Sequence, residues 1–307
     1  MRLSDLFKIR REIPLWEAVV LGLLCVLLVL GLWWFVTRGE TPEDRILEYH
    51  KLASPGETFA TLRDLWFDRA LTRNTLASLR RVALGFGLAA LVGVPLGVLS
   101  GCFFRIGAFL APLSLFGRNI PVAALIPLTF SLFGIGELHK AMFIFIAAVA
   151  FVLSDTARAV MDVGGEYIDT AYTLGASRWQ VVVKVLFPLA MPAIFNSLRL
   201  LFGLAFGYIM LAEAIKLGGE SGGLGDIIIT SQRRGPREHI LLVLMIIPLV
   251  ALGIDRLLFW VQKELFPHRY GGSGIFNRCV RVVLHAWEDA QSLLLRRTAP
   301  GRKASRP

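Results

Sequence analysis

The side chains that could do chemistry in this chain are a few charged and amide groups inside long apolar runs. Arg118 and Asn119 stand in an apolar stretch (108–133) that three prolines interrupt, and Asn196 and Arg199 lie in a later one. Charged groups in a bilayer are costly, so they usually line a pathway, pair with one another or face the protein interior. A broken helix leaves backbone groups open only where a cavity or protein can satisfy them. We therefore predict that these four residues line a path, in which Arg118 would suit an anionic solute.

These polar residues also have alternative roles that need no transport path. Arg118 could lie at the cytosolic edge of the bilayer and extend its guanidinium to the interface, and Asn196 and Arg199 carry the same ambiguity. Glu137, His139 and Lys140 are predicted to form a solvated cluster in a short external turn. We find no nucleophile–base arrangement and no grouping of His, Cys, Asp and Glu with metal-ligand spacing, so we predict neither a catalytic nor a metal site.

The elements that hold these side chains are predicted to be membrane-spanning helices. The 307 residues are 55% hydrophobic and 18% charged, well to the apolar side of a soluble domain. The run 15–36, with Glu17 as its one charge, can cross a bilayer core at about 1.5 Å per residue. No small-residue cleavage site follows it, so we predict an uncleaved helix with a cytosolic N-terminus. Further apolar runs bring the expected number of crossings to six: 82–104, 108–133, 141–153, 192–215 and 239–261.

The polar segments between and after the spans complete this outline. Residues 37–74 have amphipathic helical spacing, 216–238 are rich in glycine, and both are predicted to be external. The net charge of +10 owes much to the basic ends, as is typical of the cytosolic side of membrane spans, and does not require nucleic acid. Three cysteines, an odd number, predict no disulfide framework.

Two glycine patterns predict helix packing. Gly93, Gly97 and Gly101 recur every four residues, and Gly203 and Gly207 repeat the spacing later. Small residues at this interval let a second helix approach closely. We expect all five glycines to serve the bundle and not the solute.

A short segment between two spans, "DTAYTLGASRWQVVVKVLFP", predicts two helices joined at a glycine. Gly175 follows an apolar face that includes Ala171, at a position where a left-handed residue would end a helix. Ser177 and Gln180 match a capping box that would start the next helix, and Pro188 marks the boundary beyond it. We therefore predict a cytosolic helix–turn–helix whose apolar faces need the membrane or a partner to cover them.

This segment resembles the EAA signature of ABC-importer permeases. The signature positions read Asp169-Thr170-Ala171, Gly175 and Val185-Leu186-Phe187-Pro188, with the family spacing but with Asp for Glu, Thr for the first Ala and Phe for Leu. Three further stretches are similar to the nitrate, aliphatic-sulfonate and taurine importer permeases: "TLASLRRVALGFGLAALVGVPLGVLSG", "IPLTFSLFGIGELHKAMFIF" and "GLGDIIITSQRRG". Together the resemblance covers about residues 52–270.

The resemblance implies an all-α integral membrane protein of six transmembrane helices, a type I ABC importer permease bundle. The expected organisation is a cytosolic N-terminus (1–14), a first helix (15–36), an external segment (37–74), a core permease domain (75–268) with a cytosolic loop at 162–188, and a basic tail. The tail (269–307) is expected to be a cytosolic surface helix followed by disorder. The site of action would be the inner membrane of a bacterium, with both termini in the cytosol.

The resemblance also implies partners. The chain has no G-x-x-x-x-G-K-[ST] phosphate loop, so ATP and Mg²⁺ would act on a pair of separate ATPase subunits. Contact with them would fall to six residues of the 162–188 loop, namely Asp169, Thr170, Ala171, Gly175, Ser177 and Pro188. A solute-binding protein would dock outside, near Glu213, Gly222, Gly223 and Gly225. A second permease copy, most simply a homodimer, and membrane lipid complete the set, and no cofactor is expected in the chain.

Two other functional classes stay open at this point. A stand-alone secondary transporter or channel predicts an internal repeat and coupling carboxylates inside the membrane, neither of which is clear here. A membrane-integral enzyme would need a catalytic constellation. The transported solute is not named by the sequence: nitrate, sulfonates, taurine and bicarbonate use similar permeases.

Overall fold

The structure is a computed structural model that describes residues 14–39, 45, 52–215, 222–234 and 237–270. The predicted basic tail beyond residue 270 lies outside these residues. Every regular element in the described part is a helix, as expected from the composition. The chain divides into two compact units, one of residues 1–76 with 222–247 and one of residues 77–221 with 248–307.

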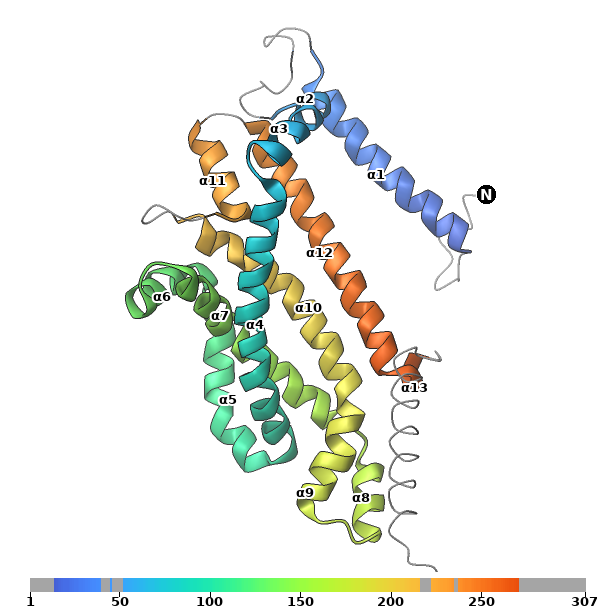
Figure 1. The fold of residues 1–307 in the computed structure, drawn as a ribbon. Coiled ribbons are helices and arrows are strands. Elements are labelled where there is room, and N and C mark those ends of the chain that lie inside the picture. Colours follow the sequence, from blue (N-terminus) through green and yellow to red (C-terminus); the bar gives the residue numbers. More distant parts are fainter. Residues whose placement is uncertain (1–13, 40–44, 46–51, 216–221, 235–236, 271–307) are drawn as a thin grey trace, which may run out of the picture. The chain divides into compact units, whose positions relative to one another are not determined.

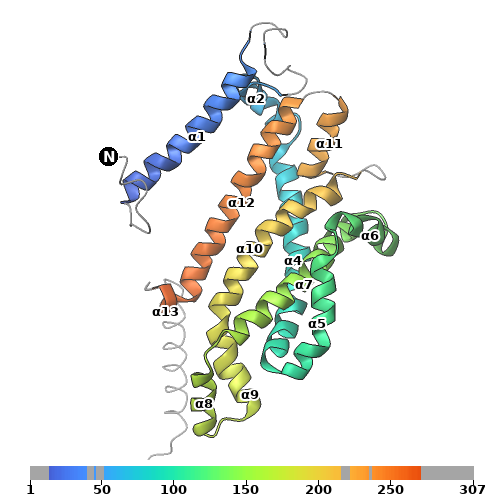
Figure 2. The same ribbon diagram turned by 180° about the vertical axis from the view of Figure 1, so that it is seen from behind.

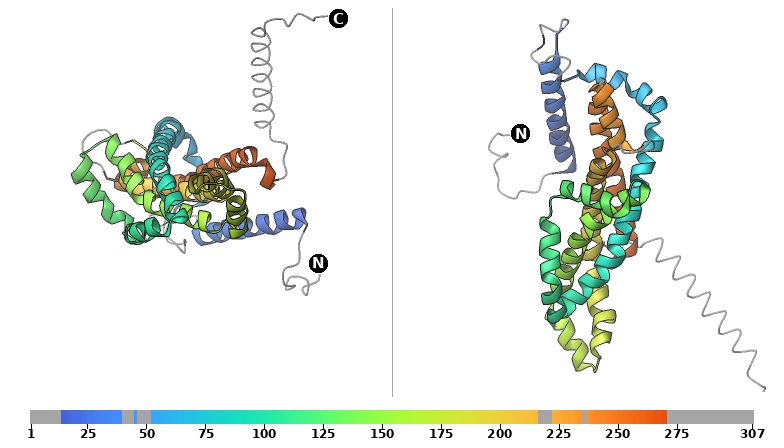
Figure 3. Two further views of the ribbon diagram at one scale, coloured as in Figure 1. Left: turned by 90° about the horizontal axis from the view of Figure 1, so that it is seen from below. Right: turned by 90° about the vertical axis from the view of Figure 1, so that its left-hand side faces the viewer.

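Within the residues that the structure describes, five helices are long and apolar enough to cross a membrane. They are α1 (Leu15–Thr37), α4 (Leu71–Cys102), α7 (Glu137–Met161), the run Arg178–Glu213 that ends in α10 (Phe187–Glu213), and α12 (Arg237–Leu265). A sixth crossing depends on a bent pair, α5 (Phe104–Asn119) with the 3₁₀ turn η2 (Val122–Ala124) and α6 (Leu125–Phe133), which turns through 92°. Figure 3 shows the bend in its right-hand view. Pro121 explains it, because proline has no N–H to continue the helical ladder of α5.

The second unit is built around α7. This helix packs against α5, α6 and α10 (Figure 1). Most of its apolar side chains are buried. The predicted glycine ridge of α4 lies against it: a Cβ on Gly97 would come within 2.6 Å of the Leu153 carbonyl oxygen, and Gly93 and Gly101 are as tightly placed. For Gly203 and Gly207 the packing prediction is wrong within the described chain, because nothing lies within 4 Å of a Cβ at either position.

The first unit joins the two segments predicted to be external. Residues 37–74 form two short helices, α2 (Pro55–Ala60) and α3 (Leu62–Phe67), as their amphipathic spacing indicated. The glycine-rich segment contains a helix that we did not predict, α11 (Leu224–Arg234). The two segments meet where the Gly223 amide donates a 2.7 Å hydrogen bond to the Asn74 side chain.

Candidate functional site

The 162–188 loop forms the predicted helix–turn–helix between α7 and α10. It contains α8 (Gly165–Thr173), α9 (Arg178–Val181) and a π-helical turn, η3 (Val182–Leu186). Gly175 has φ +80°, and the adjacent Ala176 amide donates to the Ala171 carbonyl at 3.0 Å. A left-handed residue is therefore required at the turn, and glycine adopts this conformation without a steric penalty. Figure 2 shows α8 and α9 at one end of α10.

Local sequence signals fix the second half of the loop. The Ser177 hydroxyl accepts from the Gln180 amide, and the Gln180 side chain accepts from the Ser177 amide at 2.8 Å, which is the predicted capping box. The π-helical turn was not predicted. Its physical cause is Pro188, which has no N–H to bond the Lys184 carbonyl, while the Phe187 amide reaches back to Val182.

One side of the loop is anchored and the other is free. Ala171 packs in a buried cluster with Val181, Leu186 and the start of α10. Asp169, Thr170, Ser177 and Pro188 are exposed. Apolar side chains also face outward, and Leu174 and Trp179 are 82% and 63% exposed. A rigid turn that presents apolar groups beyond the bundle is a surface suited to a partner.

The α4–α5 turn lies against this loop. The rings of Phe103 and Trp179 meet edge to face with centroids 5.8 Å apart. A groove of about 560 Å³ runs between the turn and the loop, with Arg105 and Arg178 among its lining residues. Motion of the loop would therefore reach α4 and α5 directly as well as α10.

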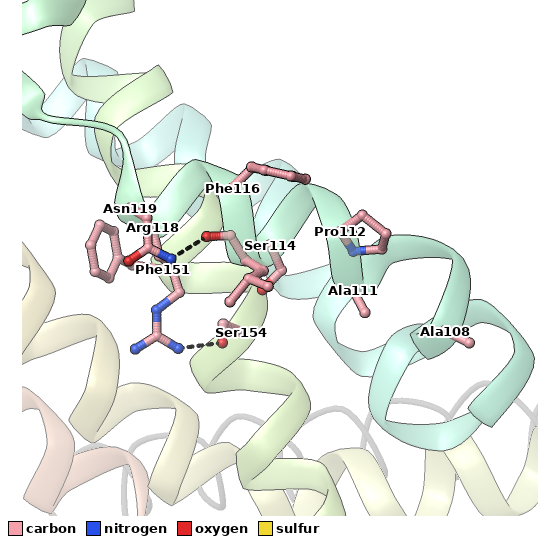
Figure 4. Close-up of a pocket in the computed structure, with 10 residues that line it drawn as sticks. Ala108, Ala111, Pro112, Ser114, Phe116, Arg118, Asn119, Phe151 and Ser154 are labelled. Carbon is pink, nitrogen blue, oxygen red and sulfur yellow. Dashed lines mark hydrogen bonds between the residues drawn. The ribbon is translucent and has the colours of Figure 1, made fainter.

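Arg118 and Asn119 open on a second hollow, the Arg118 cavity of about 820 Å³ between α5 and α7 (Figure 4). The Arg118 guanidinium donates a 2.6 Å hydrogen bond to the Ser154 hydroxyl, and its carbon lies 5.4 Å from the Phe151 ring centroid. Asn119 bonds the Leu115 carbonyl of its own helix at 2.7 Å. The structure thus brings these two predicted residues to one cavity.

The other two predicted pathway residues separate. Asn196 lines the Asp155 cavity, a hollow of about 400 Å³ between α7 and α10 that also contains Arg158. Arg199 is tied to α12 instead: its Nε lies 3.0 Å from an Asp255 carboxylate oxygen, and it donates to Gln262 at 3.2 Å. This pairing gives Arg199 a structural role, so we do not carry it into the pathway proposal.

Glu213 is not exposed, as a residue that docks a binding protein would have to be. Its carboxylate is fully buried, lies 2.7 Å from the Arg81 Nη1 atom and accepts from the Ser78 hydroxyl at 2.8 Å. Arg81 in turn reaches Glu137 on α7, with 2.8 Å between Nε and Oε2. We call Ser78, Arg81, Glu137 and Glu213 the Arg81 cluster; it joins α4, α7 and α10.

The Arg81 cluster corrects the interpretation of Glu137, His139 and Lys140 as solvated. His139 and Lys140 are buried, and the imidazole stacks on Phe130 with 3.8 Å between the ring centroids. Only Glu137 keeps exposure. One feature of the sequence could have predicted this cluster. Arg81 and Glu213 both lie near the ends of apolar spans, where charged residues usually pair with one another.

The glycines predicted to dock a binding protein lie in the first unit. Gly222 and Gly223 have φ +49° and +118°, and Gly225 is the second residue of α11. They shape the entry to α11, while the docking role itself stays a prediction.

Comparisons with known proteins place the chain among transport components. The family model of the binding-protein-dependent transport system inner membrane component matches residues 93–266. A putative ABC transporter permease protein of Methanocaldococcus jannaschii is 33% identical over 65% of this chain and 74% of its own. The bicarbonate transport system permease protein CmpB of Synechococcus elongatus is 34% identical over 64% and 70%. The taurine transport system permease protein TauC of Escherichia coli is 28% identical over 83% and 91%.

Solved structures agree on the fold. The MetNI methionine ABC transporter, in an inward-facing conformation, matches with a TM-score of 0.58 at 21% identity, over 66% of this chain and 97% of its own. An amino acid ABC transporter matches with a TM-score of 0.56 at 17% identity, over 66% and 97%.

Proposed function

The chain belongs to the family of binding-protein-dependent transport system inner membrane components, and on that premise we propose that it is the permease subunit of an ATP-driven importer. It has no phosphate loop, so energy must come from separate ATPase subunits. The observation that carries the proposal is the 162–188 loop between two spans. It contains a rigid turn at Gly175, and apolar side chains beside this turn are exposed. The stand-alone transporter has no comparable support.

The loop can transmit force because it is stiff and anchored. Asp169, Thr170 and Leu174 lie on its exposed side, whereas Ala171 is held in the buried cluster at the start of α10. A displacement of α8 would therefore move α10 rather than bend the loop. We assign the ATPase contact to Asp169, Thr170, Gly175 and Ser177 on the exposed side, with Ala171 and Pro188 holding the geometry.

The solute is proposed to be a small anion or sulfonate. Relatives are named for bicarbonate, nitrate and taurine transport. A solute-binding protein would deliver it to the external segments of the first unit, near Gly222, Gly223 and Gly225. A second permease copy would complete the path, in an inner membrane with both chain termini in the cytosol.

Gly175 provides the test of coupling. We expect Gly175→Arg to abolish co-purification with the ATPase, because a side chain at φ +80° strains the turn and blocks the exposed side. Gly175→Asn is the matched control, since asparagine tolerates this conformation best among the larger residues. Nothing lies within 4 Å of a Cβ at this position, so thermal unfolding should report only the backbone strain of the turn, about 1–3 kcal/mol and smaller for asparagine than for arginine. Unchanged association and ATP-dependent uptake in Gly175→Arg would refute the proposal.

A further inference from the structure

Arg81, Arg118 and Arg199 lie inside the membrane-spanning helices and the bent pair of the second unit. Arg81 is paired with Glu213 and Glu137, and Arg199 is paired with Asp255. Arg118 differs: among the described residues its one hydrogen-bond partner is the Ser154 hydroxyl, and it forms no ion pair. A cation in an apolar, partly buried site without a carboxylate is electrostatically incomplete, because the membrane gives it little solvation.

The space around Arg118 continues along α7. The Arg118 cavity shares Ser154 and Ser114 with a second hollow of about 290 Å³, the Ser100 cavity. The far side of the Ser100 cavity is lined by Arg158, one helical turn beyond Ser154. Arg158 forms no ion pair with any described residue either. Each cavity is far larger than the volume of about 30 Å³ that one water occupies, so a small solute fits.

The lining of the two cavities has one sign of charge. Arg118 and Arg158 are its ionisable groups, and no carboxylate lines either hollow within the described chain. Hydroxyls from Ser100, Ser114 and Ser154 also line the two cavities and can donate to an anion. Two cations with hydroxyl donors and low-dielectric walls concentrate anions and exclude cations.

Charge changes at the next cavity. Arg158 and Arg269 line the Asp155 cavity together with Asp155 and Asp162, so two cations there face two carboxylates. Carboxylates beside a cation weaken its hold on a passing anion. The direction along α7 is from Arg118, near the bend between α5 and α6, toward Met161, where the 162–188 loop begins. An anion held between the arginines would thus reach a weaker site as it nears the loop.

We propose that the Arg118 and Ser100 cavities form an anion path along α7, with Arg118 and Ser154 binding the solute at one end and Arg158 receiving it at the other. This inference rests on the proposed function, since it names where the transported anion contacts the permease. The alternative role for Arg118, extension to lipid headgroups, would leave the cavities without anion selectivity.

Ser114 allows a direct measurement because it lines both cavities. Ser114→Cys would be made in a chain whose own cysteines (Cys25, Cys102 and Cys279) are replaced, and the purified permease would be placed in nanodiscs without any ATPase. The rates of modification by an anionic and a cationic methanethiosulfonate reagent of similar size are then compared. We expect the anionic reagent to react faster, and nitrate, bicarbonate or taurine in solution to slow it.

The variants decide the outcome. Arg118→Gln should lower the ratio of anionic to cationic rates about tenfold, as expected for one charge lost within roughly 10 Å at intermediate dielectric. Arg158→Gln should lower it as well, and Arg118→Lys should retain it. Arg105→Gln, an exposed arginine of α5 outside both cavities, is the matched control. An unchanged ratio in Arg118→Gln, or no modification of the Ser114→Cys thiol by either reagent, would overturn the path.

Uptake by the complete complex separates this inference from the proposed function. With ATPase and binding protein present, Arg118→Gln should reduce uptake of the preferred anion at least tenfold while co-purification of the ATPase is retained. Loss of association in Gly175→Asn or absence of ATP-dependent uptake in the wild type would count against the coupling proposal alone. The nanodisc ratio would still report on the path.

Discussion

At the scale of single residues, buried charge separates the structural arginines from the proposed functional one. Arg81 bridges Glu213 and Glu137, whereas Arg118 has a hydroxyl partner alone among the described residues. The first arrangement satisfies its charges internally, and removal of one member leaves the other uncompensated. Substitution in the Arg81 cluster is therefore expected to lower stability, whereas substitution of Arg118 is expected to lower anion selectivity and uptake.

Glu213→Gln should destabilise the permease by about 3 kcal/mol, because Arg81 would lose its fully buried carboxylate partner. The measurement is thermal or denaturant unfolding in detergent. Glu166→Gln is the matched control, since Glu166 is exposed on α8 and should shift stability by less than about 0.5 kcal/mol. Equal stability of the two variants would show that the Arg81 cluster contributes nothing net.

Glu57 gives the segment 37–74 a dependence on pH. Hydrogen bonding from Arg45, with help from the Ser54 amide, lowers the pKa of Glu57 from 4.5 to about 2. A carboxyl with a depressed folded pKa contributes stability above its unfolded pKa, and that contribution is lost as pH falls from about 4.5 toward 2. The partly exposed pair is screened, so we expect roughly 1 kcal/mol.

Hydrogen exchange of the α2 amides tests this dependence. Protection relative to α3 should fall between pH 5 and pH 3 in the wild type, by an amount on the order of 1 kcal/mol in opening free energy. Glu57→Gln should remove the difference between the two pH values. If protection in Glu57→Gln falls as much as in the wild type, another group controls this segment.

At the scale of elements, local signals were predictable and distant pairings were not. The turn at Gly175 and the Ser177 capping box depend on residues within a few positions of one another, so sequence alone located them. The π-helical turn before Pro188 was missed because five residues are too few for the apolar spacing to distinguish an α-helical from a π-helical turn. The partners of Glu213 lie 132 and 135 residues away, beyond the reach of any local pattern.

The two glycine patterns, Gly93, Gly97 and Gly101 on α4 and Gly203 and Gly207 on α10, show the same limit. Spacing predicted packing for both, yet only the α4 glycines face another helix at close range in the described chain. A four-residue interval defines a helix face without saying what covers it. Likewise α11 was missed because its apolar patch is short and glycines precede it.

Packing of α4 on α7 yields a matched pair of substitutions. Gly97→Ala should lower the unfolding free energy by about 1–3 kcal/mol, since the added Cβ would lie 2.6 Å from both Leu153 O and Thr156 Cβ. Gly203→Ala should be neutral or slightly stabilising, because that position is open and alanine favours helix. Unfolding in detergent measures both, and a similar loss in both variants would contradict the close packing at Gly97.

At the scale of the whole molecule, the bent pair decides the topology. If α5 and α6 together cross the membrane, the described part of the chain has six candidate spans; if they turn back, it has five. Between Gly56 on α2 and Gly165 on α8 lie α4, the bent pair and α7. Three crossings place these two glycines on opposite sides, and two crossings place them on the same side. The coupling proposal requires opposite sides, because α2 must be external and α8 cytosolic.

Single cysteines at the two glycines test this parity, since nothing lies within 4 Å of a Cβ at either position and both should tolerate substitution. In a chain without its own cysteines, Gly56→Cys should react with a membrane-impermeant maleimide in right-side-out vesicles, and Gly165→Cys only in inverted ones. Reaction of both from one side would show that the bent pair re-enters. It would then place the 162–188 loop on the same face as the external segment, where no cytosolic ATPase could reach it.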